Sequence, residues 1–246
     1  MIIVHCRKYG AQLVYTQMFN ANSFICSKDY RENNFTTCAE DRPLIVQFGG
    51  HDPQTLLKAA KYVEHQCDAI DINLGCPQAI AKRGRYGAYL MEELDLLIEI
   101  VSLLSQNLSI PVTCKTRIYH DFERSKRLCE TLINAGAKLL TIHGRTRDEK
   151  GHNTGAVEWS MIKQLKDYFR DRVPIIANGG IEFFSDIDRC LSYTECDGMM
   201  VSEAVLENPA FFMDSQYGGQ KLTQIDLAGT KNIVLICMCV CIPLSY

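Results

Sequence analysis

Short apolar runs alternate along the chain with stretches in which apolar residues recur at helical spacing. The runs that predict β-strands are Ala11–Gln17, Leu44–Phe48, Ala69–Asn73, Val112–Arg117, Leu139–His143, Val173–Ala177 and Gly198–Ser202. The stretches that predict helices are Pro53–His65, Glu92–Gln106, Phe122–Ala135, Trp159–Phe169 and Phe183–Leu191. This alternation is the βαβ pattern, which implies a parallel sheet with right-handed crossovers. Most of the strands are apolar along their length, as expected where both faces of a sheet are buried.

Polar side chains stand at the carboxyl ends of six of these strands and favour one of two architectures. They are Gln47, Asp71, Asn73, Lys115, Arg117, His143, Asn178, Ser202 and Glu203. In a doubly wound open sheet such groups would spread along a ridge, whereas in a (β/α)₈ barrel the strand ends converge on one axial pocket. Convergence favours a TIM-type barrel. The pattern gives seven strands, one fewer than a complete barrel needs.

The composition excludes several classes of protein. The 246 residues are 47% hydrophobic and 22% charged, which excludes a largely disordered or fibrous chain. The formal net charge of −3 gives no general basic field, so contact with nucleic acid would need a local patch or a further domain. The apolar run Ile233–Leu244 is shorter than the roughly 20 residues of a membrane-spanning helix, and we expect no membrane partner.

The twelve cysteines form no CxxC pair and no group with zinc-finger spacing, so we expect no metal site. The first residues lack the long apolar core of an export signal. Many thiols without export indicate a reducing compartment, the cytoplasm or the nucleus, in which most cysteines serve as small core hydrophobes.

One cysteine lies in a loop that suits chemistry. Cys76 follows a predicted strand in the run Asn-Leu-Gly-Cys-Pro, which holds it near the barrel axis. Gly75 permits backbone angles that other residues avoid, and Pro77 stiffens the exit of the loop. The alternative is a buried structural thiol, which we expect for the other eleven cysteines. The rim position favours a functional thiol at Cys76.

Two further strand ends carry basic side chains. Lys115 lies within a buried strand, where an ammonium group is costly unless it meets an anion or an acceptor. His143 ends the next strand and Arg145 follows it, in positions that suit a phosphate or another polyanion. The alternatives are a lysine that reaches outward between helices and a histidine satisfied within the core.

The last two strand ends suit a phosphate group. Asn178, Gly179 and Gly180 follow the penultimate strand, and Ser202 and Glu203 follow the last. In TIM-type barrels the backbone N–H groups of these two loops, with a short helix after the last strand, form a phosphate site. A pair of glycines alone often marks only a turn. The prediction of a phosphate site therefore depends on the position of this pair directly after the penultimate strand.

Together these motifs resemble the tRNA-dihydrouridine synthases. The runs that carry the resemblance are LIVQFGG, AIDINLGCPQAIAKRGRYGAYL, VTCKTR, LLTIHGRT, PIIANGGI and DGMMVSEAVLENPAFF, between Arg7 and Phe212. They are most similar to the eukaryotic branch that acts on uridines 16 and 17 of the tRNA D-loop. Tyr86, between Arg85 and Gly87, is one departure from the family's loop.

The resemblance implies an FMN-containing barrel that reduces uridine to 5,6-dihydrouridine in the D-loop of tRNA. NADPH would reduce the flavin, hydride would pass from flavin N5 to C6 of the uracil, and Cys76 would donate a proton to C5. Asn73 and Arg145 would bind the substrate. The residues that would bind FMN are Gln47, Lys115, His143, Asn178, Gly179, Gly180, Ser202 and Glu203. Because an acidic side chain disfavours phosphate, only backbone N–H groups are expected to help at Ser202 and Glu203.

The sequence departs from the family pattern at both ends. The family's first strand, with an Ala-Pro-Met-type motif, has no counterpart here, Met1–His5 match nothing in it, and an apolar tail replaces the helical domain that follows the barrel. We therefore expect a truncated chain, with a barrel over 1–212 that lacks its first strand and C-terminal helical domain, and an atypical tail over 213–246. One further hypothesis is that Ile233–Val240 fills the vacant strand position, which would need a parallel return.

Two other functions stay open at this stage. The missing first strand and helical domain are consistent with a non-catalytic relative that binds FMN poorly. The barrel would also suit an FMN oxidoreductase that acts on a free pyrimidine.

Overall fold

The computed structural model describes residues 6–7, 9–208, 210–212 and 238–241, the last four as backbone. Its strands are β1 (Leu13–Tyr15), β2 (Phe19–Asn20), β3 (Leu44–Gly49), β4 (Ala69–Leu74), β5 (Val112–Arg117), β6 (Leu140–His143), β7 (Ile175–Asn178), β8 (Gly198–Val201) and β9 (Met238–Cys241). Strands β3 to β8 lie side by side in chain order, each parallel to the next. Both β1 and β2 run parallel to β3. All seven predicted strands are confirmed.

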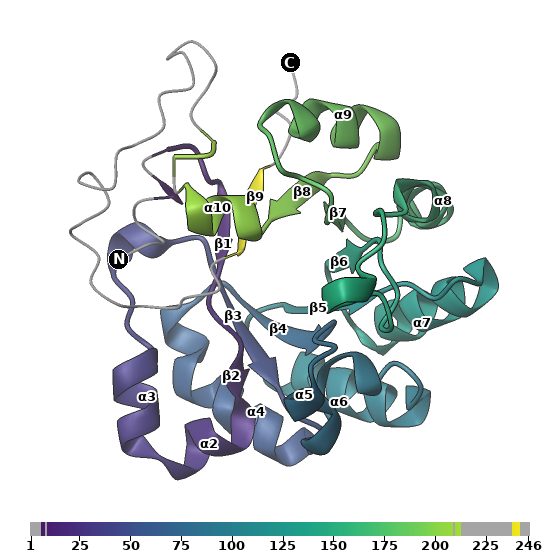
Figure 1. The fold of residues 1–246 in the computed structure, drawn as a ribbon. Helices are drawn as coiled ribbons and strands as arrows, with labels where there is room; N and C mark the ends of the chain where they lie inside the picture. Colours follow the sequence, from purple (N-terminus) through teal and green to yellow (C-terminus); the bar gives the residue numbers. More distant parts are fainter. Residues whose placement is uncertain (1–5, 8, 209, 213–237, 242–246) are drawn as a thin grey trace.

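Strand β9 closes this sheet into a ring. It runs antiparallel to β8 and to β1, with Val240 opposite both Met200 and Leu13. Because β1 also pairs with β3, the strands follow one another around a barrel (Figure 1). The expected α/β barrel is confirmed, and part of the tail occupies the position that seven strands would leave vacant. The strand runs antiparallel to both neighbours, so the expected parallel return is wrong. Residues 1–5 and 233–237 lie outside the described residues.

Helices cover the outside of the barrel (Figure 1). The long ones are α4 (Pro53–Val63), α6 (Leu94–Asn107), α7 (Phe122–Ala135), α8 (Trp159–Phe169) and α9 (Ser185–Thr194), which confirms the five predicted helices to within three residues at each end. The short helix expected after the last strand is α10 (Glu203–Glu207). The sequence did not predict β2, α2 (Ala21–Cys26), α3 (Lys28–Asn34), α5 (Ala79–Arg83) or the 3₁₀ turns Ala39–Asp41, Glu64–Gln66, Gly87–Tyr89 and Gly151–Asn153. Each of these is too short to show a helical repeat of apolar positions.

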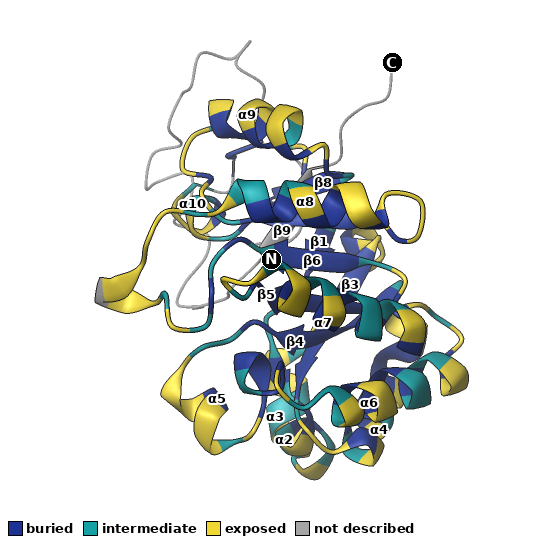
Figure 2. Ribbon diagram, turned by 90° about the vertical axis from the view of Figure 1, so that its right-hand side faces the viewer, coloured by how far each residue is buried: buried dark blue, intermediate teal, exposed yellow. Residues whose placement is uncertain are grey.

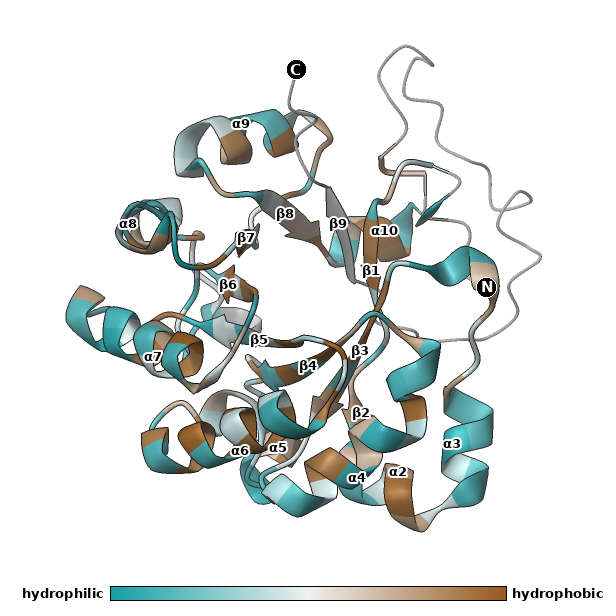
Figure 3. Cartoon of the chain, turned by 180° about the vertical axis from the view of Figure 1, so that it is seen from behind, coloured by the Kyte–Doolittle hydropathy of each residue, from teal (hydrophilic) through white to brown (hydrophobic). Residues whose placement is uncertain are grey.

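The starts of α4 and α7 follow from local chemistry. The carboxylate of Asp52 accepts a hydrogen bond from the Thr55 N–H at 2.7 Å, and that of Asp121 accepts from the Arg124 N–H at 2.8 Å. Such side chains satisfy N–H groups that the helix itself leaves unpaired. The helices turn apolar faces to the sheet and polar faces outward, as the colouring by burial and by hydropathy shows (Figures 2 and 3).

The barrel has two separate cores. The larger lies between the sheet and the helices and includes outward-pointing strand residues such as Val46, Ile70 and Ile72. The smaller consists of Tyr15, Ile45, Ala69, Ile176 and Met200, which come from five different strands and so meet inside the ring. Successive residues of a strand alternate between the two faces, so polar residues two or four positions further along, toward the carboxyl ends, also point inward. The sequence suggested strands that are apolar on both faces. This expectation is wrong for the inner face, which is polar toward the carboxyl ends.

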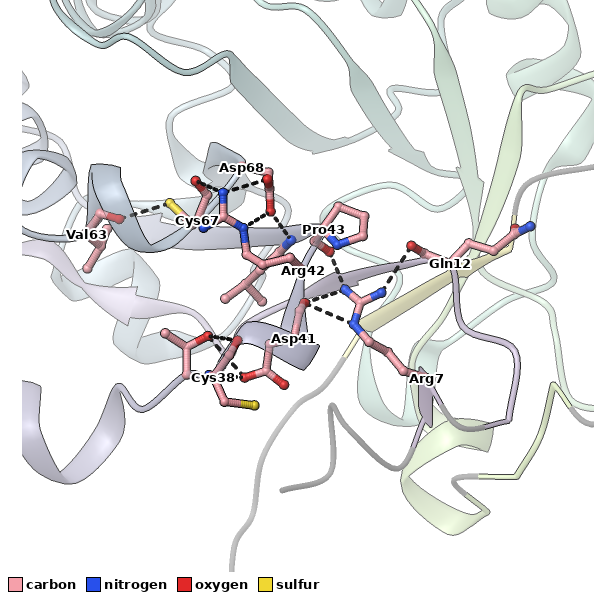
Figure 4. A network of polar contacts seen from close by, with 11 residues as sticks. Arg7, Gln12, Cys38, Asp41, Arg42, Pro43, Val63, Cys67 and Asp68 are labelled. Carbon is pink, nitrogen blue, oxygen red and sulfur yellow. Dashed lines mark hydrogen bonds and ion pairs between the residues drawn. The ribbon is translucent and has the colours of Figure 1, made fainter.

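An arginine network ties together the amino ends of the strands, opposite the polar rim. Nε and Nη2 of Arg42 donate to the Asp68 carboxylate at 2.5 and 2.7 Å, and the Leu44 N–H also donates to Asp68 (Figure 4). Arg7 donates to the backbone carbonyls of Asp41 and Pro43. These bonds fix the start of β3 against the turn before β4, and they leave the carboxyl ends free to carry function.

Candidate functional site

Three inward-facing polar side chains of β3 and β4 form a hydrogen-bonded chain inside the barrel. Gln47 Nε2 donates to Asp71 Oδ2 at 2.8 Å, and Asn73 Nδ2 donates to Gln47 Oε1 at 2.8 Å. On the other side of Asp71, the Thr113 hydroxyl donates to Oδ1 at 2.6 Å. Burial raises the pKa of Asp71 to about 6, although the bonds from Thr113 and Gln47 oppose this shift.

The last member of this chain holds the backbone of the cysteine loop. Asn73 Oδ1 accepts hydrogen bonds from the N–H groups of Gly75 at 3.0 Å and Cys76 at 2.9 Å. The Cys76 carbonyl accepts from the Ala88 N–H at 3.0 Å, which ties the loop to the segment that follows α5. Cys76 itself is half-buried, so its side chain is partly open to the rim.

Two side chains hold the residue after the cysteine. The Pro77 carbonyl accepts from the Tyr89 hydroxyl at 3.0 Å and from Lys150 Nζ at 2.6 Å. Lys150 Nζ also lies 6.0 Å from the centre of the Tyr89 ring, and the guanidinium of Arg147 lies 5.3 Å from it. The loops after β4 and β6 are thereby joined beside Cys76, with two cations at the rim.

Lys115 is a buried cation beside the cysteine loop. Its residue is only 7% exposed, and among the residues that the structure describes its ammonium group has no hydrogen bond or ion pair. Burial, together with the charge of Arg117, lowers the pKa of Lys115 to about 8, whereas Asp71 and Cys76 act in the opposite direction. The predicted inward position of Lys115 is confirmed in the register of β5, where it stands beside Asn73 and Thr141.

Arg117 belongs to the same face of β5 and was not among the predicted site residues. Its Nε donates to the Gly75 carbonyl at 2.8 Å, and its Nη1 donates to the Thr146 carbonyl at 2.7 Å. Burial, followed by the charge of Arg145, lowers the pKa of Arg117. The side chain therefore connects the cysteine loop to the loop after β6.

His143 lies at the end of β6, close to the cations of the site. Burial, and next the charge of Lys115, lowers the pKa of His143 to about 2, so the imidazole is neutral at physiological pH. Arg145 Nη1 lies 3.4 Å from His143 Nε2, while Arg145 Nε donates to the Gly155 carbonyl at 2.8 Å. These two contacts hold the guanidinium beside the histidine at the rim.

The predicted phosphate loops lie at the ends of β7 and β8. Asn178 is buried, and its Nδ2 donates to the Met200 carbonyl at 3.0 Å, so its amide joins the two strands. The Gly179 carbonyl accepts from Trp159 Nε1 at 3.1 Å. Ser202 is the residue before α10 and its side chain makes no capping hydrogen bond, while the Glu203 side chain is exposed.

The chain also matches known proteins by sequence. The Dihydrouridine synthase (Dus) family model matches residues 1–235, most of the chain. The chain belongs to the dihydrouridine synthase family. The resemblance that the motifs carry is thus confirmed for the family as a whole.

Several curated members of the dihydrouridine synthase family are similar to this chain. A tRNA-dihydrouridine(16/17) synthase [NAD(P)(+)] of Saccharomyces cerevisiae is 47% identical over 84% of this chain and 49% of its own length. A tRNA-dihydrouridine(16/17) synthase of Schizosaccharomyces pombe is 45% identical over 84% of this chain and 52% of its own. A human tRNA-dihydrouridine(20a/20b) synthase-like protein is 37% identical over 84% of this chain and 64% of its own. The chain spans about half the length of the first two relatives.

The fold of this dihydrouridine synthase family member has a solved counterpart. A crystal structure of DHODH from Eimeria tenella, in complex with ferulenol, superposes with a TM-score of 0.54 over 83% of this chain and 67% of the other. At 15% sequence identity this likeness supports the barrel fold alone.

The described part of this family member carries neither a membrane-spanning helix nor a metal cluster. None of its described helices is long and apolar enough to cross a membrane. Within the same residues, no three histidine, cysteine or acidic side chains group together in a way that could hold a metal ion.

The structure brings the predicted residues of β3 to β7 to one end of the barrel and adds others to which the sequence argument gave no role in the site. Asp71, Thr113 and Arg117 stand two residues before or after a predicted site residue on the same strand. Because side chains alternate, positions two apart share a face, and this signal could have found all three.

Proposed function

We propose that this chain reduces uridine in tRNA to 5,6-dihydrouridine, with FMN as cofactor and NADPH as reductant. The observation that carries the proposal is the ammonium of Lys115, which is buried beside the loop of Cys76 and has no hydrogen bond or ion pair among the described residues. Such a cation needs an anionic or strongly accepting ligand, and a thiol held beside that ligand can serve as a proton donor. Membership of the dihydrouridine synthase family, and relatives named for tRNA uridines, support the same reaction.

The residues fit FMN at two points. Lys115 would face the part of the isoalloxazine ring on which negative charge builds up, which would give the ammonium its missing partner. A β-carbon on Gly179 would stand 2.8 Å from the His143 ring, so glycine allows the loop after β7 to pass close to the imidazole that would face the ribityl chain or the phosphate.

The remaining cofactor contacts follow from the placement of the predicted residues. Gln47 would meet the pyrimidine edge of the ring, and the neutral His143 would donate to the ribityl chain or the phosphate. The N–H groups of Asn178, Gly179, Gly180, Ser202 and Glu203 would surround the phosphate. When bound, FMN supplies the hydride that adds to C6 of the uracil, and NADPH then reduces the flavin again.

Cys76 would donate the proton that C5 of the uracil needs. Its side chain is partly open to the rim, and its backbone is held through the Gly75, Cys76 and Ala88 N–H bonds described above. A fixed thiol opposite a bound ring provides proximity and orientation, which accelerates proton transfer. The proton would return to the thiol from solvent after each turnover.

The rim offers cations for the RNA backbone. Arg147 and Lys150 stand beside Tyr89 next to the cysteine loop, and Lys82, Arg83 and Arg85 lie in the segment that follows it. Asn73 and Arg145 would contact the substrate, although both already hold backbone or histidine groups. A local group of cations of this kind is what a chain with a net charge of −3 needs to bind RNA.

The test is NADPH-dependent formation of dihydrouridine in an unmodified tRNA transcript by the FMN-loaded chain, measured by mass spectrometry of nucleosides. Cys76→Ala should lower the rate about 100-fold or more while flavin stays bound. The control Cys26→Ala changes an exposed thiol on α2 and should leave the rate unchanged. Failure to bind FMN, or reduction of free pyrimidines in preference to tRNA, would contradict the proposal.

A further inference from the structure

The hydrogen-bonded chain inside the barrel has a fixed direction. A carboxylate accepts hydrogen bonds and donates none, so Asp71 obliges Gln47 to turn its NH₂ group toward it at 2.8 Å. The carbonyl oxygen of Gln47 then faces Asn73 and accepts from the NH₂ group of that residue. Asn73 is left with its own oxygen toward the loop, where the N–H groups of Gly75 and Cys76 donate to it.

Each side-chain amide could adopt two orientations that differ by exchange of oxygen and nitrogen, and the network decides between them. At the loop end the N–H groups of Gly75 and Cys76 can only donate, so they hold the oxygen of Asn73 toward them. Without an acceptor at the buried end, Gln47 could turn over, and Asn73 would lose the carbonyl that holds its NH₂ group. The groups around Asp71 favour its role as acceptor, because Thr113 also donates to it and Lys115 contributes a positive charge.

We infer that Asp71 is a positioning residue for Cys76: it sets the direction of the relay Asp71–Gln47–Asn73 and so holds the backbone of the cysteine loop in place. The inference rests on the proposed function, in which Cys76 is the proton donor. Asp71 touches neither the thiol nor the loop. Its effect reaches Cys76 through two amides whose hydrogen bonds are all 2.8 to 3.0 Å long.

The relay predicts that different substitutions at and beside Asp71 have different effects on the cysteine loop. Asp71→Leu removes both acceptors and frees Gln47 to turn over. Asp71→Asn removes the charge but can keep the direction, because its oxygen can face Gln47 while its NH₂ group donates to the Thr113 hydroxyl. Thr113→Val is the matched control, since it removes one bond to Asp71 at the same depth and leaves the bond from Gln47 intact.

The readout is the rate at which iodoacetamide alkylates Cys76, followed by peptide mass spectrometry on the full chain without tRNA or NADPH. Asp71→Leu and Gln47→Leu should each raise the rate about 5-fold or more, because loss of the loop's hydrogen bonds opens the thiol to solvent. Asp71→Asn and Thr113→Val should stay within about 2-fold of the wild-type rate. The double variant Asp71→Leu/Gln47→Leu should be no faster than the faster single variant, since it breaks one relay twice.

Buried Cys129 on α7 is the internal reference and should keep its slow rate in every variant. An unchanged or slower rate at Cys76 in Asp71→Leu, effects that multiply in the double variant, or equal acceleration at Cys129 would each overturn the inference. If Asp71→Leu does not fold, the comparison of Gln47→Leu with Thr113→Val decides the case in the same way. The alkylation result is independent of catalysis: if Cys76→Ala still reduces tRNA, the proposed function fails while the relay is judged on its own data.

Discussion

The ammonium of Lys115 and the backbone of Gly75 lie against one another: a β-carbon on Gly75 would stand 3.9 Å from Lys115 Nζ. Two motifs that are 41 residues apart in the sequence, one ending in Cys76 and the other in Arg117, are therefore neighbours in the barrel. The sequence argument required this closeness, since it placed Cys76 at the uracil and Lys115 at the flavin that reduces it. Because Lys115 lies in the site, its protonation should respond to the ligand that binds there.

Flavin binding should weaken as the pH rises above 8. The pKa of Lys115 is lowered to about 8 in the protein alone, and an anionic partner would raise it, so binding takes up a proton in this range. The affinity for FMN should then fall by up to about tenfold per pH unit above the pKa of the free site. Fluorescence titrations of FMN across this range measure the effect.

Lys115→Met is the control for that pH dependence. It should bind FMN more weakly at neutral pH and lose the part of the slope that Lys115 causes. An identical pH profile in the wild type and in Lys115→Met would rule out the ammonium as the cofactor's partner.

Alanine should be tolerated at Gly75 but not at Gly87. At Gly75 the new β-carbon would meet the Lys115 carbonyl at 3.6 Å, an ordinary contact. At Gly87 it would lie 2.6 Å from the Cys76 carbonyl, in a residue whose φ of +66° already disfavours a side chain by about 1–2 kcal/mol. We expect Gly87→Ala to lower the melting temperature and speed Cys76 alkylation, and Gly75→Ala to do neither; equal behaviour of the two variants would contradict the loop geometry.

Gly179→Ala should impair cofactor binding more than folding. Its β-carbon would stand 2.8 Å from Cδ2 and 2.9 Å from Nε2 of His143 and would displace the ring. Gly151→Ala is the matched control, because its φ is also positive, at +57°, but nothing lies within 4 Å. The affinity for FMN, measured by titration, should fall about tenfold or more only in Gly179→Ala, since only that side chain moves a binding group. Equal losses in the two variants would mean that backbone strain alone is responsible.

Proline in β9 should open the barrel. The strand pairs with β1 on one side and β8 on the other, and proline at Val240 removes a backbone donor from its centre. We expect Val240→Pro to lower the melting temperature by several degrees and to promote aggregation through the freed edges. Val240→Ala keeps the N–H group and is the control. Equal melting curves for the wild type and Val240→Pro would show that β9 contributes nothing to closure.

Much of the fold could be predicted from the sequence because it repeats. Each long helix carries an apolar stripe, and each parallel strand is a short run that contains β-branched residues, so the strand Val112–Arg117 and the helix Trp159–Phe169 are found at their predicted bounds. The sequence suggested that the tail fills the vacant strand position, but not that β9 would run antiparallel to both of its neighbours.

The sequence predicted residues of the candidate site but not the hydrogen bonds that link them. Strand ends identify Gln47, Asn73, Lys115 and His143, since a barrel gathers them on one axis. The oxygen of Asn73 accepts a hydrogen bond from the cysteine loop, and Asp71 is linked to Asn73 through Gln47. These contacts depend on how the side chains of two strands meet, which the sequence does not show. Strand alternation points to Asp71, but only three-dimensional distances show what it touches.

The most direct test of the account follows a single turnover. The FMN-loaded chain is reduced with NADPH and then mixed with unmodified tRNA, and the return of the oxidised flavin absorbance is recorded for the wild type and Cys76→Ala. We predict that both proteins bind flavin and accept electrons from NADPH at similar rates, while oxidation by tRNA slows about 100-fold or more in Cys76→Ala. Equal rates of oxidation by tRNA in the two proteins would contradict the assignment of Cys76 as proton donor.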